Sequence, residues 1–339
     1  MKYIFLLAFF MPAIMAVAQH ITPPKIYRCE RTNVPPVIDG DINDAQWEKA
    51  SFSALFQDIE GNKKPAPEFD TRVKMLYDNE FLYIAAWMEE PHLCGWIEDD
   101  ETVIFYDNDF EIFLDYDNDG LNYREWEINT LGAAWDLMLT APYRSGGIPL
   151  TAYDIKGIKY AVKTYGTVND PSDTDSCWTV EVAIPVRTIL EGRTARYGNI
   201  AGHSWRINFS RVEWDYDVVD GGYKKRSTPE HNWVWSPQNT INMHKPEYWG
   251  WVYFAPEDGS STPGIHDLDV LWQERIQLCD IYGAIHSFRK KEKTIPERPD
   301  QLKVYIPEDV EYIREGSIYR LEWKDRGCML DHTGRFFRY

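Results

Sequence analysis

Short apolar or alternating runs, separated by loops rich in Gly, Pro, Asn and Asp, dominate most of the chain. Runs of this kind predict β-strands, and strands without long helices between them are typical of an antiparallel β-sandwich. Two of the runs flank Asp78 and Asn79, which predicts a hairpin there. The predicted strands occupy residues 72–77, 81–88, 109–115, 122–130, 133–139, 178–184, 205–212 and 248–254.

The pattern becomes helical near Asp267. Apolar residues from there on recur at three- and four-residue steps, which predicts a helix of about 25 residues. Residues 301–339 predict a small hairpin around the turn Asp325-Arg326-Gly327. We therefore expect an all-β fold, an antiparallel β-sandwich with a C-terminal helix and a small hairpin appendage.

Residues 1–18 have the features of a secretory signal peptide. Lys2 precedes an apolar run, and Ala16-Val17-Ala18 provides the small residues of a cleavage site. We expect cleavage after Ala18 and export of the mature protein to the periplasm or the cell exterior. Later apolar runs are too short to cross a bilayer, so no membrane insertion is expected.

The chain carries a formal net charge of −18 at pH 7. An acidic surface of this size repels nucleic acid and anionic lipid, so neither is an expected partner. It also disfavours acidic polysaccharides. Neutral oligosaccharides and polysaccharides remain the compatible glycans, and the oligomeric state is left open.

The cysteines are few and far apart. Their spacing contains no Cys-x-x-Cys pair, which argues against a zinc site and against a dense disulfide scaffold. One or two disulfides remain open, with pairing that the sequence does not define. The five cysteines are Cys29, Cys94, Cys177, Cys279 and Cys328.

The strands predicted at 109–115 and 122–130 share a polar face. In the second of them, Glu127 and Asn129 alternate with Trp126 and Ile128, and in the first, Glu111 alternates with apolar residues. Carboxylates, an amide and neighbouring rings suit a polyhydroxylated ligand, because sugars offer hydroxyls for hydrogen bonds and C–H faces for stacking. Solvated strand residues are the alternative interpretation.

A long loop at 213–247 contains an unusual number of aromatic residues. Trp233 and Trp235 share one face of it, and with Arg211 or Arg124 they are candidates for a stacking platform with a forked hydrogen-bond donor. Arg211 has a second interpretation, because it falls on the apolar side of its strand, where it would form a buried ion pair. The aromatic residues in or beside the loop are Trp214, Tyr216, Tyr223, Trp233, Trp235 and Tyr248.

The run Asp115-Tyr-Asp-Asn-Asp-Gly120 is similar to the first half of a calcium loop. Asp115, Asp117 and Asp119 alternate before a glycine, but the twelfth position is Trp126 instead of the glutamate of an EF-hand. The sequence leaves two interpretations open, a weak structural calcium site on these three aspartates and a charged hairpin turn without a metal.

Several of these segments together resemble carbohydrate-binding module family 9, in the single-module exported form found in Bacteroidetes. The resemblance covers residues 37 to 254 and places the module at 19–258, with an extension at 259–339. Its landmarks, in order, are Val37-Ile-Asp-Gly40 with Trp47, Asp78-x-x-Phe-Leu-Tyr-Ile84, Asp107-Asn-Asp-Phe-Glu-Ile-Phe-Leu-Asp115, Trp126-Glu-Ile-Asn129 with Trp135-Asp136, Trp178-Thr-Val-Glu-Val-Ala-Ile-Pro185 and Trp205-Arg-Ile-Asn-Phe-Ser-Arg211.

The resemblance implies an immunoglobulin-like β-sandwich that binds carbohydrate. In the family, two aromatic rings sandwich the terminal sugar while polar side chains hold its hydroxyls. The position of the first ring resembles Phe105 or Tyr106, and Trp233 or Trp235 would supply the second. Some family members also bind calcium, which keeps the calcium interpretation of the acidic turn open beside the metal-free one.

The polar positions of the family match less completely. Its acidic position resembles Glu111, and an amide position resembles Asn129. Its arginine has no counterpart, since Glu127 occupies the nearest position and Arg124 would have to substitute. The resemblance therefore predicts the fold more directly than it predicts which sugar is bound.

The leading hypothesis is an exported, non-catalytic carbohydrate-binding protein that assists polysaccharide catabolism. The sequence establishes no cofactor for it and leaves calcium open. A glycoside hydrolase component of xylanase type is the first alternative, because such modules accompany xylanases. A haem-binding redox sandwich is the second, with His92, Met75 and Met88 as candidate axial ligands. The sequence contains no Gly-x-Ser-x-Gly, His-Glu-x-x-His or phosphate-binding glycine loop.

Overall fold

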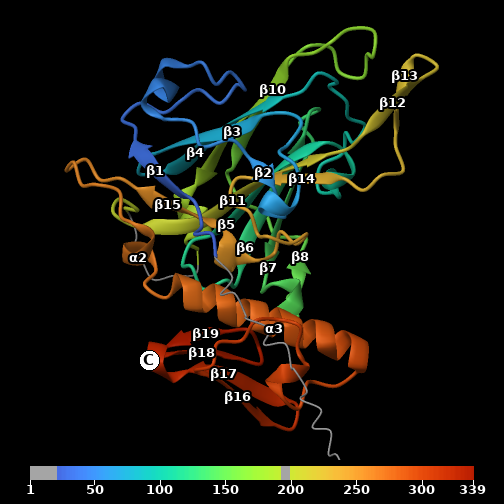
Figure 1. Ribbon diagram of the computed structural model, residues 1–339. Helices are drawn as coiled ribbons and strands as arrows, with labels where there is room; N and C mark the ends of the chain where they lie inside the picture. The colour runs from blue at the N-terminus through green and yellow to red at the C-terminus, as the bar shows by residue number, and fades with distance from the viewer. Residues whose placement is uncertain (1–20, 192–198) are drawn as a thin grey trace, which may run out of the picture.

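In the computed structural model, which describes residues 21–191 and 199–339, thirteen strands join in one hydrogen-bonded arrangement that curls into two facing layers (Figure 1). Eleven of them follow one another in space as β8 (Pro149–Leu150), β7 (Ala134–Leu139), β6 (Tyr123–Asn129), β5 (Asp109–Asp115), β11 (Ser204–Glu213), β15 (Gly250–Phe254), β1 (Ile26–Arg31), β3 (Thr71–Tyr77), β4 (Phe81–Glu89), β10 (Cys177–Pro185) and β9 (Lys159–Tyr165). β14 (His231–Val234) adds to β11, and β2 (Gln57–Asp58) adds to β14.

The predicted all-β sandwich is confirmed, with one departure from antiparallel pairing. β1 runs parallel to both of its neighbours. Its first residues, Ile26–Cys29, pair with β15, and its last two, Glu30 and Arg31, pair with β3. β1 thus passes from one layer to the other and joins them.

The main core lies between the two layers and is built from alternate residues of each strand. Phe110, Ile112 and Leu114 of β5 face this core, as do Val180 and Val182 of β10 in the opposite layer. Burying one such side chain stabilises the fold by about 1.5–3 kcal/mol. The two-residue period of the sequence therefore places one face of β5 inside the sandwich.

The hairpin predicted around Asp78 is confirmed as β3 and β4. The Asp78 carboxylate accepts hydrogen bonds from the amides of Glu80 and Phe81, at 2.7 and 2.8 Å, which closes the turn. β4 pairs with β3 on one side and β10 on the other, so it is a central strand, as its continuous apolar sequence predicts.

The C-terminal part contains the expected helix and a larger sheet than expected. α3 (Trp272–Glu292) lies between the sandwich and a four-stranded antiparallel sheet (Figure 1). This sheet consists of β16 (Val310–Glu315), β17 (Ile318–Trp323), β18 (Cys328–Asp331) and β19 (Phe336–Arg338). The predicted hairpin accounts for β17 to β19, and β16 completes a sheet with its own apolar core against α3.

The remaining elements are short. β12 (Tyr216–Val219) and β13 (Gly222–Lys225) form a hairpin arm that projects from the sandwich (Figure 1). The short helices are η1 (Ala45–Lys49), η2 (Gly61–Lys63), η3 (Ile104–Tyr106), η4 (Tyr143–Ser145), α1 (Val186–Ile189), η5 (Pro246–Tyr248), α2 (Ile265–Leu268), η6 (Pro299–Gln301) and η7 (Lys324–Arg326).

Two expectations concern the thiols and the membrane. All five cysteines are buried and carry free thiols, so neither of the disulfides that the sequence allowed is formed. Among the described residues, no helix is both long enough and apolar enough to span a membrane. The predicted signal peptide lies outside the described residues.

Candidate functional site

The strand register divides the predicted site residues between two faces of the sheet. Glu111 of β5 lies directly opposite Glu127 of β6, on the face that points away from the main core. Arg211 of β11 lies opposite Phe110, a core residue, and therefore on the other face. Arg124 alternates with Glu127 and also lies on the core side. The predicted carboxylates and arginines do not form one site.

Arg211 is a buried ion-pair residue, which is one of the two interpretations that the sequence left open. Its guanidinium is 0% exposed and lies 2.8 Å from carboxylate oxygens of both Glu90 and Glu213. It also donates to the Thr71 hydroxyl and the Glu89 carbonyl. With its donors committed inside the protein, Arg211 is not available to a ligand, and its prediction as a carbohydrate contact is corrected.

Arg124 is likewise committed to structural contacts. It donates to the Asn122 carbonyl at 2.6 Å and to the Tyr153 hydroxyl at 3.3 Å. Its guanidinium carbon lies 5.3 Å from the centroid of the Tyr116 ring, and the residue is 6% exposed. The substitution of Arg124 for the family arginine is therefore corrected as well.

Trp233 and Trp235 belong to the main core and are 3% and 2% exposed. Gly250 makes room for the Trp235 ring, since a Cβ atom at this residue would lie 2.2 Å from it. The predicted stacking platform is wrong, because both indoles are covered by protein. The loop sequence shows how many aromatic residues it contains, but not whether their side chains point into the core or toward the surface.

Asn129 has a structural role that uses both ends of its amide. Its Nδ2 donates to the Ile97 carbonyl and to the Asp107 carboxylate, at 2.8 and 3.0 Å. Its Oδ1 accepts from the amides of Leu131 and Ala133, both at 3.1 Å. Asn129 thus holds two loops in place, and its prediction as a direct sugar contact is corrected.

Glu111 and Glu127 lie in a buried carboxylate cluster, defined as Asp109, Glu111, Glu125 and Glu127. Burial raises the pKa of Glu111 to about 7, and burial followed by the charge of Glu111 raises the pKa of Glu127. The two residues are 6% and 2% exposed, too little for a sugar to reach them. They are brought together as predicted, but beneath the surface.

The predicted first ring, at Phe105 or Tyr106, lies on the surface. Tyr106 is 59% exposed, and its ring centroid lies 4.8 Å from that of Phe105. Both residues belong to η3, directly before β5 begins. Other rings gather at the same end of the sandwich, and we call the group the ring patch: Trp96, Phe105, Tyr106, Trp214, Tyr216 and Tyr223.

The hairpin arm, β12 and β13, connects Trp96 to the other rings of the ring patch. Tyr216 of β12 lies opposite Lys225 of β13 and packs against Trp96 with the rings tilted, at 5.3 Å between ring centroids. The Lys225 ammonium lies 3.8 Å from the centroid of the Trp214 ring and donates to the Tyr106 carbonyl. Trp96, at 47% exposure, and Tyr106 present the most open rings of the patch.

Sequence reasoning missed Trp96 because it lies in an irregular loop between two strands. The only local signal for an ordered, exposed ring was that Trp96 directly follows a glycine, Gly95. A Cβ atom at Gly95 would lie 2.7 Å from the Thr130 hydroxyl, so the glycine lets the loop approach β6 closely. Of the six aromatic residues singled out in or beside the 213–247 loop, Trp214, Tyr216 and Tyr223 belong to the ring patch, whereas the other three are buried.

The acidic turn brings its three aspartates together. One carboxylate oxygen from each of Asp115, Asp117 and Asp119 lies within 4.8 Å of the others. Asp115 also accepts from the amides of Asn118 and Gly120, at 3.1 and 2.9 Å, which fixes the turn without a metal. Calcium at this turn stays a prediction.

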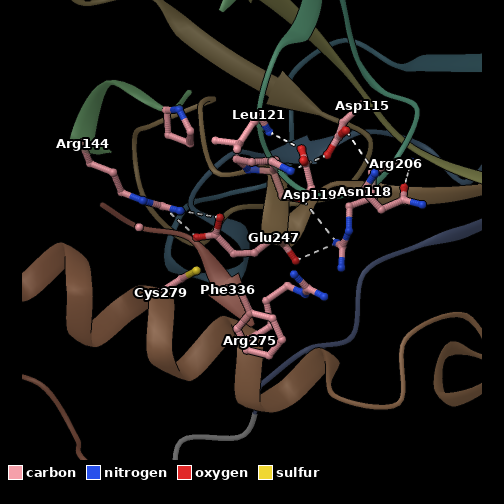
Figure 2. Close-up of a pocket in the computed structure, with 14 residues that line it drawn as sticks. Asp115, Asn118, Asp119, Leu121, Arg144, Arg206, Glu247, Arg275, Cys279 and Phe336 are labelled. Atoms are coloured by element: carbon pink, nitrogen blue, oxygen red, sulfur yellow. Dashed lines mark hydrogen bonds and ion pairs between the residues drawn. The ribbon is translucent and has the colours of Figure 1, made fainter. Parts of the chain in front are cut away.

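A small pocket separates the acidic turn from α3 and encloses about 30 Å³, room for one water molecule (Figure 2). Arg144 forms a bidentate pair with Glu247, at 2.8 and 2.7 Å. Although burial raises the pKa of Glu247, Arg144 lowers it below the ordinary value. This ion pair joins η4 to η5 at the edge of the sandwich, and the pocket leaves little space for a sugar.

The candidate haem ligands are in unsuitable positions. Met75 and Met88 are completely buried in the main core, whereas His92 is exposed and contacts Tyr223. A haem at either methionine would have to displace core side chains. The structure gives this alternative no support.

The fold and its exposed ring patch define the class as a β-sandwich with a surface suited to ligand binding. Comparison with family models gives a match over residues 38–254 to the family described as carbohydrate family 9 binding domain-like, and the chain belongs to this family. It is a family of non-catalytic carbohydrate-binding modules, and no catalytic family is indicated. A search of curated proteins found no match.

Two solved structures are similar to this chain to different degrees. A proposed carbohydrate-binding protein from Bacteroides uniformis is 15% identical, with a TM-score of 0.51, and the alignment covers 68% of this chain and 99% of that one. A family 9 module from Caldicellulosiruptor kristjanssonii in complex with cellotriose is 18% identical, with a TM-score of 0.43 and coverages of 71% and 99%.

Proposed function

We propose that the protein binds neutral oligosaccharides or polysaccharides at the ring patch. The observation that carries this proposal is the exposure of Trp96 and Tyr106 within a contiguous group of rings at one end of the sandwich. Exposed rings of this size offer flat apolar faces to the C–H groups of a sugar. Membership in a carbohydrate-binding family supports the same ligand class.

The loops beneath the rings are held firmly. The Asp107 carboxylate accepts from the amides of Trp96 and Ile97, both at 2.8 Å, and the Trp214 indole donates to the Phe105 carbonyl at 2.9 Å. Rings fixed before binding lose less conformational entropy when a ligand arrives. The patch is therefore prepared for its ligand.

The expected affinity is modest. Each ring that stacks on a sugar contributes about 0.5–1.5 kcal/mol, and each hydrogen bond contributes about 1 kcal/mol. Two rings with a few hydrogen bonds correspond to roughly micromolar to millimolar dissociation constants. Lys225, beside the Trp214 ring, is a suitable donor to a sugar hydroxyl.

We further propose that residues 19–258 are the binding module, that 259–339 form an extension packed on it, and that the protein works outside the cytoplasm in polysaccharide catabolism. The predicted leader supports export, and the net charge of −18 supports neutral over acidic glycans. A ligand-capturing role needs no catalytic group.

Isothermal titration calorimetry over glucan, xylan and mannan oligosaccharides tests the proposal. We expect at least one neutral glycan to bind, and Trp96→Ala and Tyr106→Ala each to weaken binding by about tenfold, as loss of one stacked ring predicts. Tyr305→Ala removes a ring that is 39% exposed in the C-terminal part and serves as the control. Absence of binding to every glycan, or equal binding by all variants, would overturn the proposal.

A further inference from the structure

The carboxylate cluster concentrates four acidic groups in one buried region. Asp109 and Glu111 extend from β5, and Glu125 and Glu127 extend from the same face of β6. Their exposed fractions are 0%, 6%, 6% and 2%. Buried carboxylates repel one another strongly unless a positive charge or shared protons accompany them.

Basic side chains do not neutralise this cluster. Across residues 21–191 and 199–339, every ion pair that a lysine or arginine makes is with a carboxylate outside the cluster. Arg211, on the neighbouring strand, points to the other face and is paired with Glu90 and Glu213. Among the residues that the structure describes, no basic side chain therefore matches the charge of the cluster.

Two carboxylate oxygens in the cluster lack any hydrogen-bond partner. Asp109 accepts one hydrogen bond, from the Val212 amide to Oδ1, while its buried Oδ2 accepts none. Oε2 of Glu125, two residues from Glu127 on the same face of β6, is also buried without a hydrogen-bond donor. Unpartnered buried oxygens of this kind are ready acceptors for a cation.

The spacing of the oxygens fits a calcium ion. Asp109, Glu111 and Glu127 each supply one oxygen, and these three atoms lie within 4.8 Å of one another. Calcium binds oxygens at about 2.3–2.6 Å, so two ligands on opposite sides of the ion lie about 4.6–5.2 Å apart. The donor set contains only hard oxygens, which favours calcium over softer metals.

We propose that Asp109, Glu111 and Glu127 form a buried calcium site on the face of β5 and β6 that points away from the main core, distinct from the acidic turn at 115–119 and from the ring patch. The Ser210 hydroxyl, directly opposite Glu111 in the register, would supply a further oxygen from the neighbouring strand. Calcium would offset two of the buried negative charges. The site would thereby bind β5 to β6 immediately below η3, which carries Phe105 and Tyr106.

The test compares the full chain refolded from urea in millimolar calcium chloride with the same chain refolded in EDTA, so that a buried site can fill. We expect calcium to raise the thermal midpoint of the wild type and to remain bound in elemental analysis. Glu111→Gln should weaken calcium binding by about tenfold or more and remove the rise in midpoint. In EDTA this variant should be at least as stable as the wild type, because it removes one repelling charge.

Asp119→Asn is the matched control, since it removes a carboxylate from the acidic turn and leaves the cluster intact. Asp109→Asn replaces Glu111→Gln if that variant does not fold. The proposal stands when the cluster variant loses the calcium effect and Asp119→Asn keeps it, and any other combination overturns it. Glycan binding at the ring patch is measured separately, so failure here is distinguishable from failure there.

Discussion

The Arg206 guanidinium of β11 lies 3.1 Å from the Asp269 carboxylate in the segment before α3, and Arg275 of α3 binds the same carboxylate at 3.0 Å. Asp269 thus links two arginines from different parts of the chain. Arg206 is 1% exposed, and burial lowers its pKa to about 10. Asp269 is its ion-pair partner, and the charges of Asp115 and Glu247 add to the compensation.

Removing Asp269 is expected to be costly. Asp269→Ala leaves Arg206 buried without its carboxylate, a situation that lowers the free energy of unfolding by about 3–5 kcal/mol. Urea unfolding followed by tryptophan fluorescence measures the effect. Asp217→Ala is the control, because its pair with Arg226 is exposed, at 55% and 48%, and pairs of this kind contribute about 0–1 kcal/mol. Equal losses in both variants would contradict the structural role of Asp269.

Two glycines make opposite predictions for the same substitution. Gly250→Ala places a Cβ atom 2.2 Å from the Trp235 ring, and overpacking of this kind destabilises a core by about 1–3 kcal/mol. Gly283→Ala in α3 meets nothing within 4 Å and should stabilise the helix by about 0.5–1 kcal/mol. Thermal midpoints of the two variants should move in opposite directions, and a shared direction would refute the packing at Trp235.

His244 is expected to make stability depend on pH. Burial lowers its pKa to about 4, while it shares a 2.9 Å hydrogen bond with the Tyr123 hydroxyl and makes an edge-to-face contact with the Tyr143 ring. The unfolded chain therefore binds the proton more readily, and stability falls as pH decreases from the ordinary histidine pKa, about 6.5, to about 4. The loss attributable to this group is at most about 3 kcal/mol.

The measurement is the difference between the wild type and His244→Gln across that window. Comparison with the variant is needed because Glu111 acts in the opposite direction. Its pKa is raised to about 7, so its contribution to the stability of the protein is lost as pH rises. In His244→Gln the acid-side loss should become smaller. Parallel pH profiles for the two proteins would rule out a buried neutral histidine.

Asn129 should affect the ring patch without contacting a ligand. Asn129→Ala removes four hydrogen bonds, with Ile97, Asp107, Leu131 and Ala133, and an unsatisfied buried group alone costs about 1–3 kcal/mol. Hydrogen exchange of the segment around Trp96 should accelerate. Unchanged exchange there would show that the loop is held by other contacts.

Alternation in the sequence was enough to predict β5, β6, β11 and the β3–β4 hairpin, because each has one apolar face or a wholly apolar strand. It was not enough for β1, whose sequence Ile-Tyr-Arg-Cys-Glu-Arg has no clear period and whose parallel partners lie far along the chain. Pairing between distant segments leaves no local signal.

Site residues were likewise predictable only where a local sequence pattern fixes their position. The ring expected at Phe105 or Tyr106 was found on the surface, because its position is tied to the start of a well-defined strand. Trp233 and Trp235 were assigned to a ligand, because a loop sequence does not show which side chains turn inward. Their direction is set by β14 pairing with β11 and by the space at Gly250.

The position of β1 has a consequence for how the protein is made. Its two partners, β3 and β15, lie near the beginning and near the end of the sandwich sequence. A chain emerging from the ribosome can form the β3–β4 hairpin early, but the seam that β1 closes must wait until β15 has been synthesised. Completion of the sandwich is therefore a late event, and chains truncated before β15 should accumulate as open, protease-sensitive intermediates.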